Sequence, residues 1–305
     1  QLLVEQSWHL ELDDPADSDQ LGGSSNESNT AGTNHSGGVR VHYYLEKELA
    51  DTDTISLRFF DPENKLIRSF SNHPIKDEGE LGKSEIGTNL FVWDMRYPKA
   101  DKFDGMLMWW GTLNGPKAPP AEYTVDIFLN GKRYGSGHKF NILKDPRSEG
   151  TEADLQLKFE FLLDIRNTLD KTHDAIADMR LIKGQISKMN QLIEKGESQK
   201  VVDKGIELDS IMTGIEKKLY QTKLKSNQDM LNFPIMLNNK LAHVASLASM
   251  SNDRPTEQMI LVRDELTKQI NELLQKWEDI KNVEIPAYNE MIRTQKINII
   301  GLPKD

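Results

Sequence analysis

The sequence predicts a multidomain α+β chain in which an immunoglobulin-like β-sandwich is followed by an all-α antiparallel four-helix bundle. Apolar residues alternate with a period of two between Val39 and Leu143, which is typical of short strands. From Thr151 onward, apolar residues recur every three or four positions, as on one face of a helix. The Lys144-Asp145-Pro146-Arg147 stretch separates the two patterns. We therefore place the sandwich at residues 39–147 and the bundle at 148–305.

Length and composition limit the classes of function. With 305 residues, 37% of them hydrophobic and 28% charged, the chain is long enough for two domains with their own cores. The net charge of -10 argues against a nucleic-acid partner, and no apolar run reaches the roughly 20 residues needed to cross a bilayer. The lack of cysteine excludes disulfides and thiolate chemistry. We therefore expect neither nucleic-acid binding nor membrane insertion.

Residues 1–38 are expected to form a short N-terminal segment and a flexible linker. Residues 1–12 are apolar enough for an edge strand or for a segment that docks on a neighbour. Residues 13–38 are acidic and rich in Gly, Ser and Asn, so they cannot offset the entropy lost on ordering. Their acidic cluster lacks the glycine and the closing glutamate of an EF-hand loop, which favours a solvated linker over a calcium site. Because the chain begins at Gln1 rather than Met, we expect a processed or truncated piece of a longer protein.

The sandwich strands follow from the alternation and from the turns between them. Strands are expected at residues 39–45, 55–59, 66–70, 90–95, 123–129 and 132–143. The Asp61-Pro62 pair starts a turn that makes residues 55–70 a hairpin. Asn130-Gly131 is a strong signal for a type I′ turn, since both residues tolerate positive φ.

The helices are predicted from their caps and their apolar periodicity. Thr151 and Asp154 form a capping box that opens a first helix about 60 Å long. A second helix is expected at residues 199–226, a third beginning at Asn232 as N-cap, and a fourth beginning near Pro255 that Pro286 ends or kinks. Inward positions are expected to include Leu162, Ile165, Leu169, Ile176, Met179, Leu208, Ile211, Leu219, Leu241, Val262, Leu266, Leu273 and Trp277.

The sequence offers little catalytic chemistry. Its seven histidines show no ligand spacing, and no nucleophile elbow, P-loop or dinucleotide motif occurs. His173 and His243 lie on or beside inward helix faces, where a satisfied core histidine is the preferred interpretation. Carboxylates are abundant, but sequence alone cannot distinguish a glycosidase-like pair from surface charge. We therefore assign no catalytic residue, no metal ligand and no cofactor.

Trp109 and Trp110 are the candidate contact residues. In a strand, adjacent side chains point to opposite faces, so one ring can pack inside while the other stays near the surface. A core or loop anchor is the preferred interpretation. An exposed tryptophan also suits docking on another domain or stacking on a glycan, and both alternatives stay open.

Several motifs, taken in order, resemble one region of a known family. They are G-V-R-V-H-Y-Y-L at 38–45, F-x-D-P-E-N-K at 59–65, G-T-N-L-F-V-W-D-M-R-Y-P at 87–98, G-P-K-A-P-P-A-E-Y-T-V at 115–125, K-D-P-R at 144–147, F-P-I-M-L-N-N-K-L-A at 233–242 and R-P-T-E-Q at 254–258. Together they resemble the C-terminal region of large Bacteroidota proteins known as BNR-repeat or sortilin-like glycosyl hydrolases. The resemblance spans residues 13–303. In that family, a β-propeller precedes this sandwich and helical bundle.

The resemblance sets the functional expectation. No propeller repeat or Asp-box occurs in this chain, so no catalytic residue of the family can be carried onto it. The resemblance implies an extracytoplasmic location, in the periplasm, at the outer-membrane surface or secreted. We expect non-catalytic accessory modules that brace their own N-terminal propeller and present a helical face to a partner such as an outer-membrane protein complex. The alternatives are part of a glycoside hydrolase whose catalytic propeller lies outside this chain, and a carbohydrate-binding module.

Overall fold

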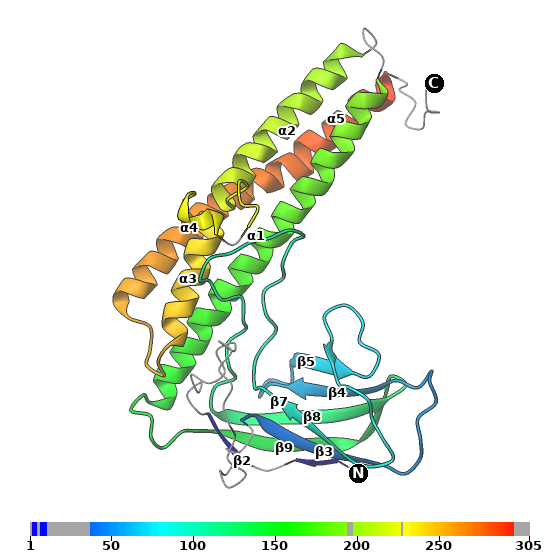
Figure 1. The fold of residues 1–305 in the computed structure, drawn as a ribbon, viewed down its shortest axis with the longest axis vertical. Coiled ribbons are helices and arrows are strands. Elements are labelled where there is room, and N and C mark those ends of the chain that lie inside the picture. Colours follow the sequence, from blue (N-terminus) through cyan, green and yellow to red (C-terminus); the bar gives the residue numbers. More distant parts are fainter. Residues whose placement is uncertain (1, 5–6, 11–36, 194–197, 227, 296–305) are drawn as a thin grey trace. The chain divides into compact units, whose positions relative to one another are not determined.

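The structure, a computed structural model, describes residues 2–4, 7–10, 37–193, 198–226 and 228–295. The chain divides into two compact units, each with its own hydrophobic core. The strand unit comprises Gln1–Pro98, Asn114–Glu160 and Ser251–Arg254, and the helical unit comprises Lys99–Leu113, Phe161–Met250 and Pro255–Asp305. The protein is therefore a multidomain α+β chain (Figure 1). None of the helices in the described ranges is long and apolar enough to cross a membrane.

The strand unit contains two sheets. The three-stranded sheet has the order β1 (Leu2–Val4), β3 (Val39–Leu45), β7 (Gly87–Trp93). The six-stranded sheet has the order β2 (Ser7–Leu10), β9 (Lys132–Lys144), β8 (Ala121–Leu129), β4 (Ile55–Phe60), β5 (Leu66–Ser71), β6 (Gly79–Glu80). β1 pairs antiparallel with β3 and β2 pairs parallel with β9, so the N-terminal segment supplies an edge strand to each sheet. The edge strand expected in residues 1–12 is confirmed, whereas nearly all of the expected linker lies outside the described residues.

The core of the strand unit lies between the two sheets. Trp93 on β7 is fully buried, and its ring stacks on that of Phe59 on β4 with the centroids 4.5 Å apart. The rings of Tyr123 and Phe140 meet Trp93 edge-on, at 6.4 and 6.3 Å. Aromatic rings in such arrangements contribute about 0.5–1.5 kcal/mol per pair beyond the area that they bury. The six predicted strands are present, although the one expected at residues 90–95 runs from Gly87 to Trp93. The φ values of 49° at Asn130 and 75° at Gly131 match the predicted hairpin turn.

The helical unit is built on α1 (Glu152–Leu192), whose first turns belong to the strand unit. The predicted capping box is present, because Asp154 N–H donates to Thr151 Oγ1 over 3.1 Å and Thr151 N–H donates to the Asp154 carboxylate over 3.0 Å. The other helices are α2 (Gln199–Leu219), α3 (Leu237–Ser249), α4 (Glu257–Asp279) and α5 (Ile285–Thr294) (Figure 1).

Two predicted helix boundaries were wrong, the end of the second helix and the start of the third. α2 ends at Leu219 rather than at residue 226, because Tyr220 takes an extended conformation with φ −138° and ψ 146°. The third helix begins at Leu237 rather than after Asn232, which instead follows a separate 3-10 turn (Asp229–Leu231). The carboxylate of Asp229 accepts the N–H groups of Lys225 and Ser226 and so stabilises that turn. The fourth helix begins near Pro255 as predicted, with Thr256 as its N-cap.

Pro286 does not end the last helix. A π-helical stretch (Ile280–Glu284) joins α4 to α5, and Ile285 N–H donates to Ile280 O five residues earlier. Proline has no N–H and its ring clashes with the carbonyl four residues before it, so a wider turn keeps the helical path continuous.

The core of the helical unit follows the predicted stripes with two corrections. The residues Ile165, Leu169, Ile176, Met179, Leu208, Leu219 and Leu241 are at most 1% exposed. Ile211 and Val262 were predicted to face inward, but they are 41% and 48% exposed. On α2 the buried stripe runs through Leu208, Met212 and Ile215, and on α4 it starts at Leu266. On α2 the predicted inward position at Ile211 was therefore off by one residue. On α4 the predicted buried stripe began too early, at Val262.

Candidate functional site: a tryptophan pair held on helix α3

The stretch Lys99–Leu113, here called the docked segment, belongs to the helical unit. The sequence placed it in the middle of the sandwich. Its apolar residues Ala100, Phe103 and Leu113 are instead buried in the helical core, and Ala100 N–H donates to Leu113 O over 2.8 Å where the segment closes. The segment interrupts the path from β7 to β8, so its apolar residues complete a core other than that of the sheets.

His173 on α1 fixes the start of the docked segment. Its side chain is 1% exposed, and Nδ1 lies 2.7 Å from the Asp101 carbonyl oxygen. A carbonyl can only accept, so Nδ1 carries the proton and Nε2 accepts from Asn238 Nδ2 over 3.3 Å. Burial lowers the pKa of His173, which keeps the ring neutral despite the opposing contributions of the Asp101 carbonyl and two nearby aspartates. The satisfied core histidine expected here is confirmed.

A buried ionic cluster fixes the middle of the docked segment. Glu216 on α2 is 3% exposed and binds Arg180 Nε at 2.7 Å and Lys183 Nζ at 2.5 Å, both from α1. Arg180 also donates to the Asp104 carbonyl over 3.0 Å, and its guanidinium lies 4.6 Å above the Phe103 ring. Burial is the largest single influence and opposes ionisation, but hydrogen bonds from both cations outweigh it and lower the pKa of Glu216. The cluster therefore joins α1 and α2 by ion pairs, and Arg180 also binds a carbonyl and a ring of the docked segment.

Side chains of α3 hold the end of the docked segment. Asn239 Oδ1 accepts the Trp109 N–H over 2.9 Å, and Asn239 Nδ2 donates to the Trp109 carbonyl over 2.7 Å. Ser246 Oγ accepts the Thr112 N–H over 2.9 Å and lies 3.1 Å from the Trp110 carbonyl. The docked segment forms no strand or helix that would pair these main-chain groups. The side chains of α3 satisfy their hydrogen bonds instead.

The contact between the segment and α3 leaves no room for a side chain at Gly111. A β-carbon added there would lie 2.7 Å from Ala242 Cβ and 2.8 Å from Met108 Cε. The neighbouring Trp110 has φ +52°, in the left-handed region that bulky residues seldom adopt. Such a conformation costs about 1–3 kcal/mol and persists only where the surroundings impose it. The polar side chains of α3 are those surroundings.

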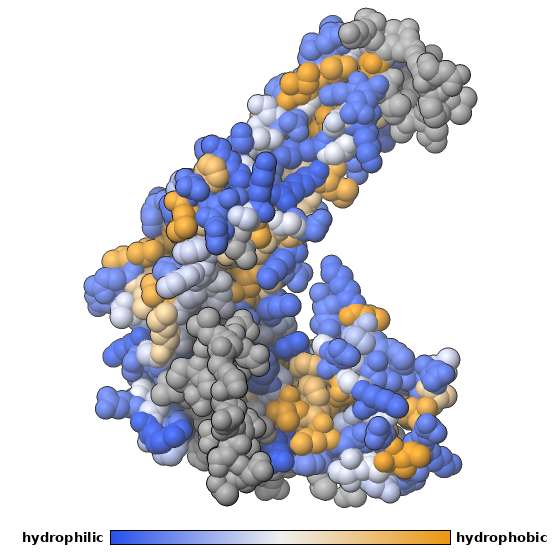
Figure 2. Space-filling view, viewed as in Figure 1, coloured by the Kyte–Doolittle hydropathy of each residue, from blue (hydrophilic) through white to orange (hydrophobic). Residues whose placement is uncertain are grey.

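The two tryptophan rings lie on the surface of the helical unit. Trp109 is 37% exposed and Trp110 is 73% exposed, and the rings are nearly parallel, with an interplanar angle of 13° and centroids 6.1 Å apart. Leu247 and Met250, 40% and 74% exposed, follow at helical spacing on the α3 face that carries the His243 contact with Trp110. Figure 2 shows hydrophobic residues as separate patches among hydrophilic ones, which is normal for a folded surface. The pair stands out because its backbone is fixed.

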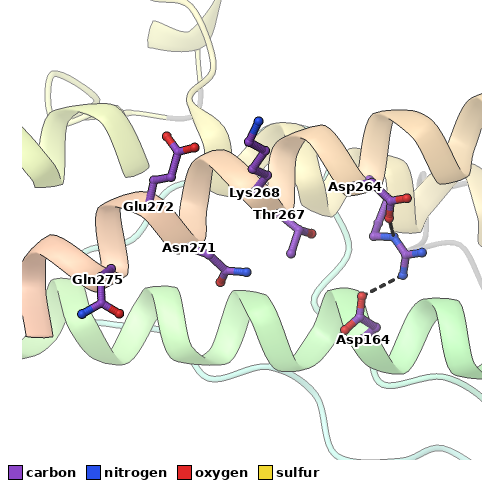
Figure 3. Close-up of a pocket in the computed structure, with 8 residues that line it drawn as sticks. Asp164, Asp264, Thr267, Lys268, Asn271, Glu272 and Gln275 are labelled. Atoms are coloured by element: carbon purple, nitrogen blue, oxygen red, sulfur yellow. Dashed lines mark hydrogen bonds and ion pairs between the residues drawn. The ribbon is translucent and has the colours of Figure 1, made fainter.

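A second candidate region is a groove between α1 and α4 (Figure 3). It has a volume of about 530 Å³ and contains Arg263, which binds Asp164 of α1 at 2.7 Å and Asp264 at 2.6 Å. Figure 3 shows Asn271 pointing toward α1, whereas Glu272 points away. The groove therefore presents an amide and two carboxylates, those of Asp164 and Asp264, that are both engaged by Arg263. Across the part of the chain that the structure describes, no three His, Asp or Glu side chains gather as a metal site requires.

Sequence reasoning singled out Trp109 and Trp110 but missed the residues that hold them. Asn239 carried a signal, because Asn238 and Asn239 interrupt the apolar face of α3, and amides on an inward face need partners. Glu216 carried a weaker signal, as a charge directly beside the buried Ile215. Neither signal identifies the partner, which lies more than 100 residues away for Asn239.

No protein-family model, curated protein or solved structure matches this chain. The functional assignment therefore depends on the tryptophan pair itself: two exposed, parallel rings on a main chain that α3 fixes by hydrogen bonds.

Proposed function

We propose that this chain is a pair of non-catalytic accessory modules that act by binding, and that Trp109 and Trp110 contact the partner. The observation that carries the proposal is that Trp110 stays 73% exposed on a left-handed backbone fixed by α3. Strained backbone conformations cluster at functional sites, and tryptophans are over-represented among residues that dominate binding energy. A preorganised backbone also lowers the entropy lost on association.

The surroundings of the pair favour a protein partner over a glycan. A glycan site needs polar groups beside the rings to fix the hydroxyls. Here Asn239 and Ser246 use their polar atoms on the docked segment, and the same face of α3 continues with Leu247 and Met250. An apolar partner surface matches this arrangement better. Glycan binding remains the second candidate because the two rings are parallel, as in stacking platforms for sugars.

We also propose that the strand unit is an immunoglobulin-like sandwich. Tyr123, near the start of β8, donates its hydroxyl to the Pro119 carbonyl over 2.7 Å, four residues upstream, which is the arrangement of a tyrosine corner. Sheets of three and six strands with a core between them also support this class. The stacked Trp93 and Phe59 occupy the core, where antibody domains place a disulfide. The helical unit is proposed as a four-helix bundle in which α5 extends the fourth helix.

At the level of the whole protein, we propose that this chain is the C-terminal part of a sortilin-like propeller protein. We also propose that this protein is extracytoplasmic. The ordered motifs from residue 38 to 258 support this placement. In this arrangement the strand unit braces the propeller and the helical unit contacts a partner such as an outer-membrane complex. The alternative is a glycoside hydrolase whose propeller carries the chemistry. Intact mass and peptide mapping of the native protein test the placement, because a mass matching only these 305 residues would rule out a propeller on the same chain.

Site-directed photo-crosslinking tests the binding proposal. A photoreactive phenylalanine replaces Trp110 in one variant and Leu181, 63% exposed on α1, in a matched variant. We expect one discrete crosslinked product in cells at position 110, lost when Trp109 is also changed to Ala, and none at position 181. Equal labelling at the two positions would refute a contact at the pair. Titration with a panel of glycans, followed by tryptophan fluorescence, tests the second candidate. A glycan-induced change in fluorescence would favour glycan binding over a protein partner.

A further inference from the structure

The strand unit contains a cavity of about 430 Å³ at the end of its two sheets where the β3–β4 loop and the β8–β9 turn lie. Its floor is apolar and comes from both sheets, with Leu45 on β3 facing Ile55, Ile127 and Leu129 of the larger sheet. Cavities of roughly 300–1,000 Å³ are the usual size of small-molecule sites. The cavity involves neither the tryptophan pair nor the helical unit.

The cavity exists because the smaller sheet does not fill the last rows of the core. Ile127 pairs with Tyr134 in register, so both side chains lie on the inner face of the larger sheet, yet Tyr134 is 65% exposed. In the smaller sheet, the register partner of Leu45 is Gly87. A β-carbon at Gly87 would meet nothing within 4 Å. The covering row therefore carries a side chain at Leu45 and none at Gly87.

The rim of the cavity is aromatic and acidic. Tyr134, 65% exposed, supplies a ring from the inner face of the larger sheet, and the β3–β4 loop supplies three carboxylates against the single ammonium of Lys47: Glu46, Glu48 and Asp53. The side chain of Asn130 and the Ala50 N–H both donate to Asp53, and they lower the pKa of its carboxyl. The rim is thus negatively charged at neutral pH and offers ring faces, which attract cations.

We propose that this cavity binds a small organic cation with an apolar body, of the alkylammonium class. The apolar body occupies the floor between Leu45 and Leu129, and the cationic head lies at the rim with the Tyr134 ring and the carboxylates. The charge of the rim selects against a carboxylate or phosphate head of the same size. The uncovered rows of the larger sheet select for an apolar body rather than a hydrated ion.

Calorimetric titration of the full chain with three probes of equal chain length tests the proposal. The probes are hexyltrimethylammonium, hexan-1-ol and hexanoate, in buffer of low ionic strength. We expect the cation to bind at least tenfold more tightly than hexanoate, with the alcohol between them and the difference reduced in 0.5 M NaCl. Absence of binding by the cation, or equal binding of the cation and the carboxylate, would overturn the proposal.

Variants locate the binding and separate it from folding. Tyr134→Ala and the double change Glu46→Gln with Glu48→Gln are each expected to weaken binding of the cation at least fivefold, and circular dichroism checks that the strands remain. Leu129→Trp fills the cavity while keeping the rim and is expected to abolish binding. The matched control is Leu90→Ala, 49% exposed on β7 and absent from the cavity lining. A loss of affinity in the control equal to that in Tyr134→Ala would overturn the location.

Discussion

Asn239 holds the main chain of Trp109 by two hydrogen bonds, one in each direction. Its carboxamide accepts from the Trp109 N–H and donates to the Trp109 carbonyl, as a neighbouring strand would. The asparagine is 4% exposed, so the pairing is shielded from water on the α3 side. The Asn239 side chain thus makes the two main-chain hydrogen bonds that a neighbouring strand would make, in a segment that is not paired with any strand.

Asn239→Ala is expected to destabilise the helical unit by about 2–4 kcal/mol, because it leaves a donor and an acceptor of Trp109 unpaired. Urea unfolding followed by circular dichroism measures the change, and tryptophan fluorescence reports release of the segment. Asn282→Ala removes an exposed amide that donates to Glu278 and is expected to cost under about 0.5 kcal/mol. Similar losses in the two variants would contradict the role assigned to Asn239.

Glu216→Gln is expected to cost about 3–5 kcal/mol at neutral pH, because it leaves Arg180 and Lys183 without their buried partner. The same pair of contacts makes stability depend on pH. The pKa of Glu216 is lower in the folded state than its usual value of 4.5, so the unfolded chain takes up the proton first as the pH falls.

The stabilisation from Glu216 is therefore full above about pH 4.5 and declines as the pH falls through the lower folded pKa. Unfolding free energies at pH 7 and pH 3 are expected to differ less in Glu216→Gln than in the unchanged chain. Glu207→Gln, at an exposed ion pair with Lys204, serves as the control and should leave the pH dependence intact. An unchanged acid-induced loss in Glu216→Gln would disprove the assignment.

Trp110→Asn is expected to raise stability by about 0.5–1 kcal/mol while it removes partner binding. Asparagine tolerates the left-handed backbone at this position better than tryptophan does, and the ring that it replaces is mostly exposed. Thermal unfolding and crosslinking measure the two effects. Trp109→Asn should bring no such gain, since the backbone of Trp109 is not left-handed. A fall in the melting temperature of Trp110→Asn would show that the exposed ring stabilises the fold.

Gly111→Ala is expected to destabilise the helical unit by about 1–3 kcal/mol, because the new methyl group would overlap Ala242 and Met108. Adding Ala242→Gly to the variant should recover part of the loss. Gly184→Ala on α1, where nothing lies within 4 Å of the added carbon, is expected to stabilise by about 0.5–1 kcal/mol. Chemical denaturation of the four proteins gives the comparison, and the absence of any rescue by Ala242→Gly would argue against direct contact.

The strands and the start of α1 could be predicted from sequence because their signals are local. Alternation fixes which face of β3 or β4 is buried, and the bonds between Thr151 and Asp154 span only three residues. The boundaries near Asn232 failed for a related reason. The Asp229 carboxylate accepts the N–H groups of Lys225 and Ser226 and fixes a separate turn there, which no propensity of Asn232 alone reveals.

The docked segment could not be predicted, because its partners are remote. The Met-Leu-Met-Trp-Trp stretch from Met106 to Trp110 shows that an apolar surface must be covered, but it does not say by what. The sequence therefore assigned it to the nearest core, that of the strands. Only the amides on the apolar face of α3 suggested that a polar partner was needed, and their pairing is a tertiary property.

The placement of Lys99–Leu113 makes the two units interleaved rather than consecutive in the chain. Phe103 completes the core that α1 and α2 surround, although it lies between two strands of the other unit. Dividing the chain at residue 148 would thus give two incomplete domains. The N-terminal fragment would lack Ser251–Arg254, and the C-terminal fragment would lack Lys99–Leu113. During synthesis, Phe103 leaves the ribosome before residues 161 onward, which form the helical core that buries it. The core therefore cannot form until those later residues are made. Recombination at the apparent boundary would likewise separate Phe103 from the helical core that buries its ring.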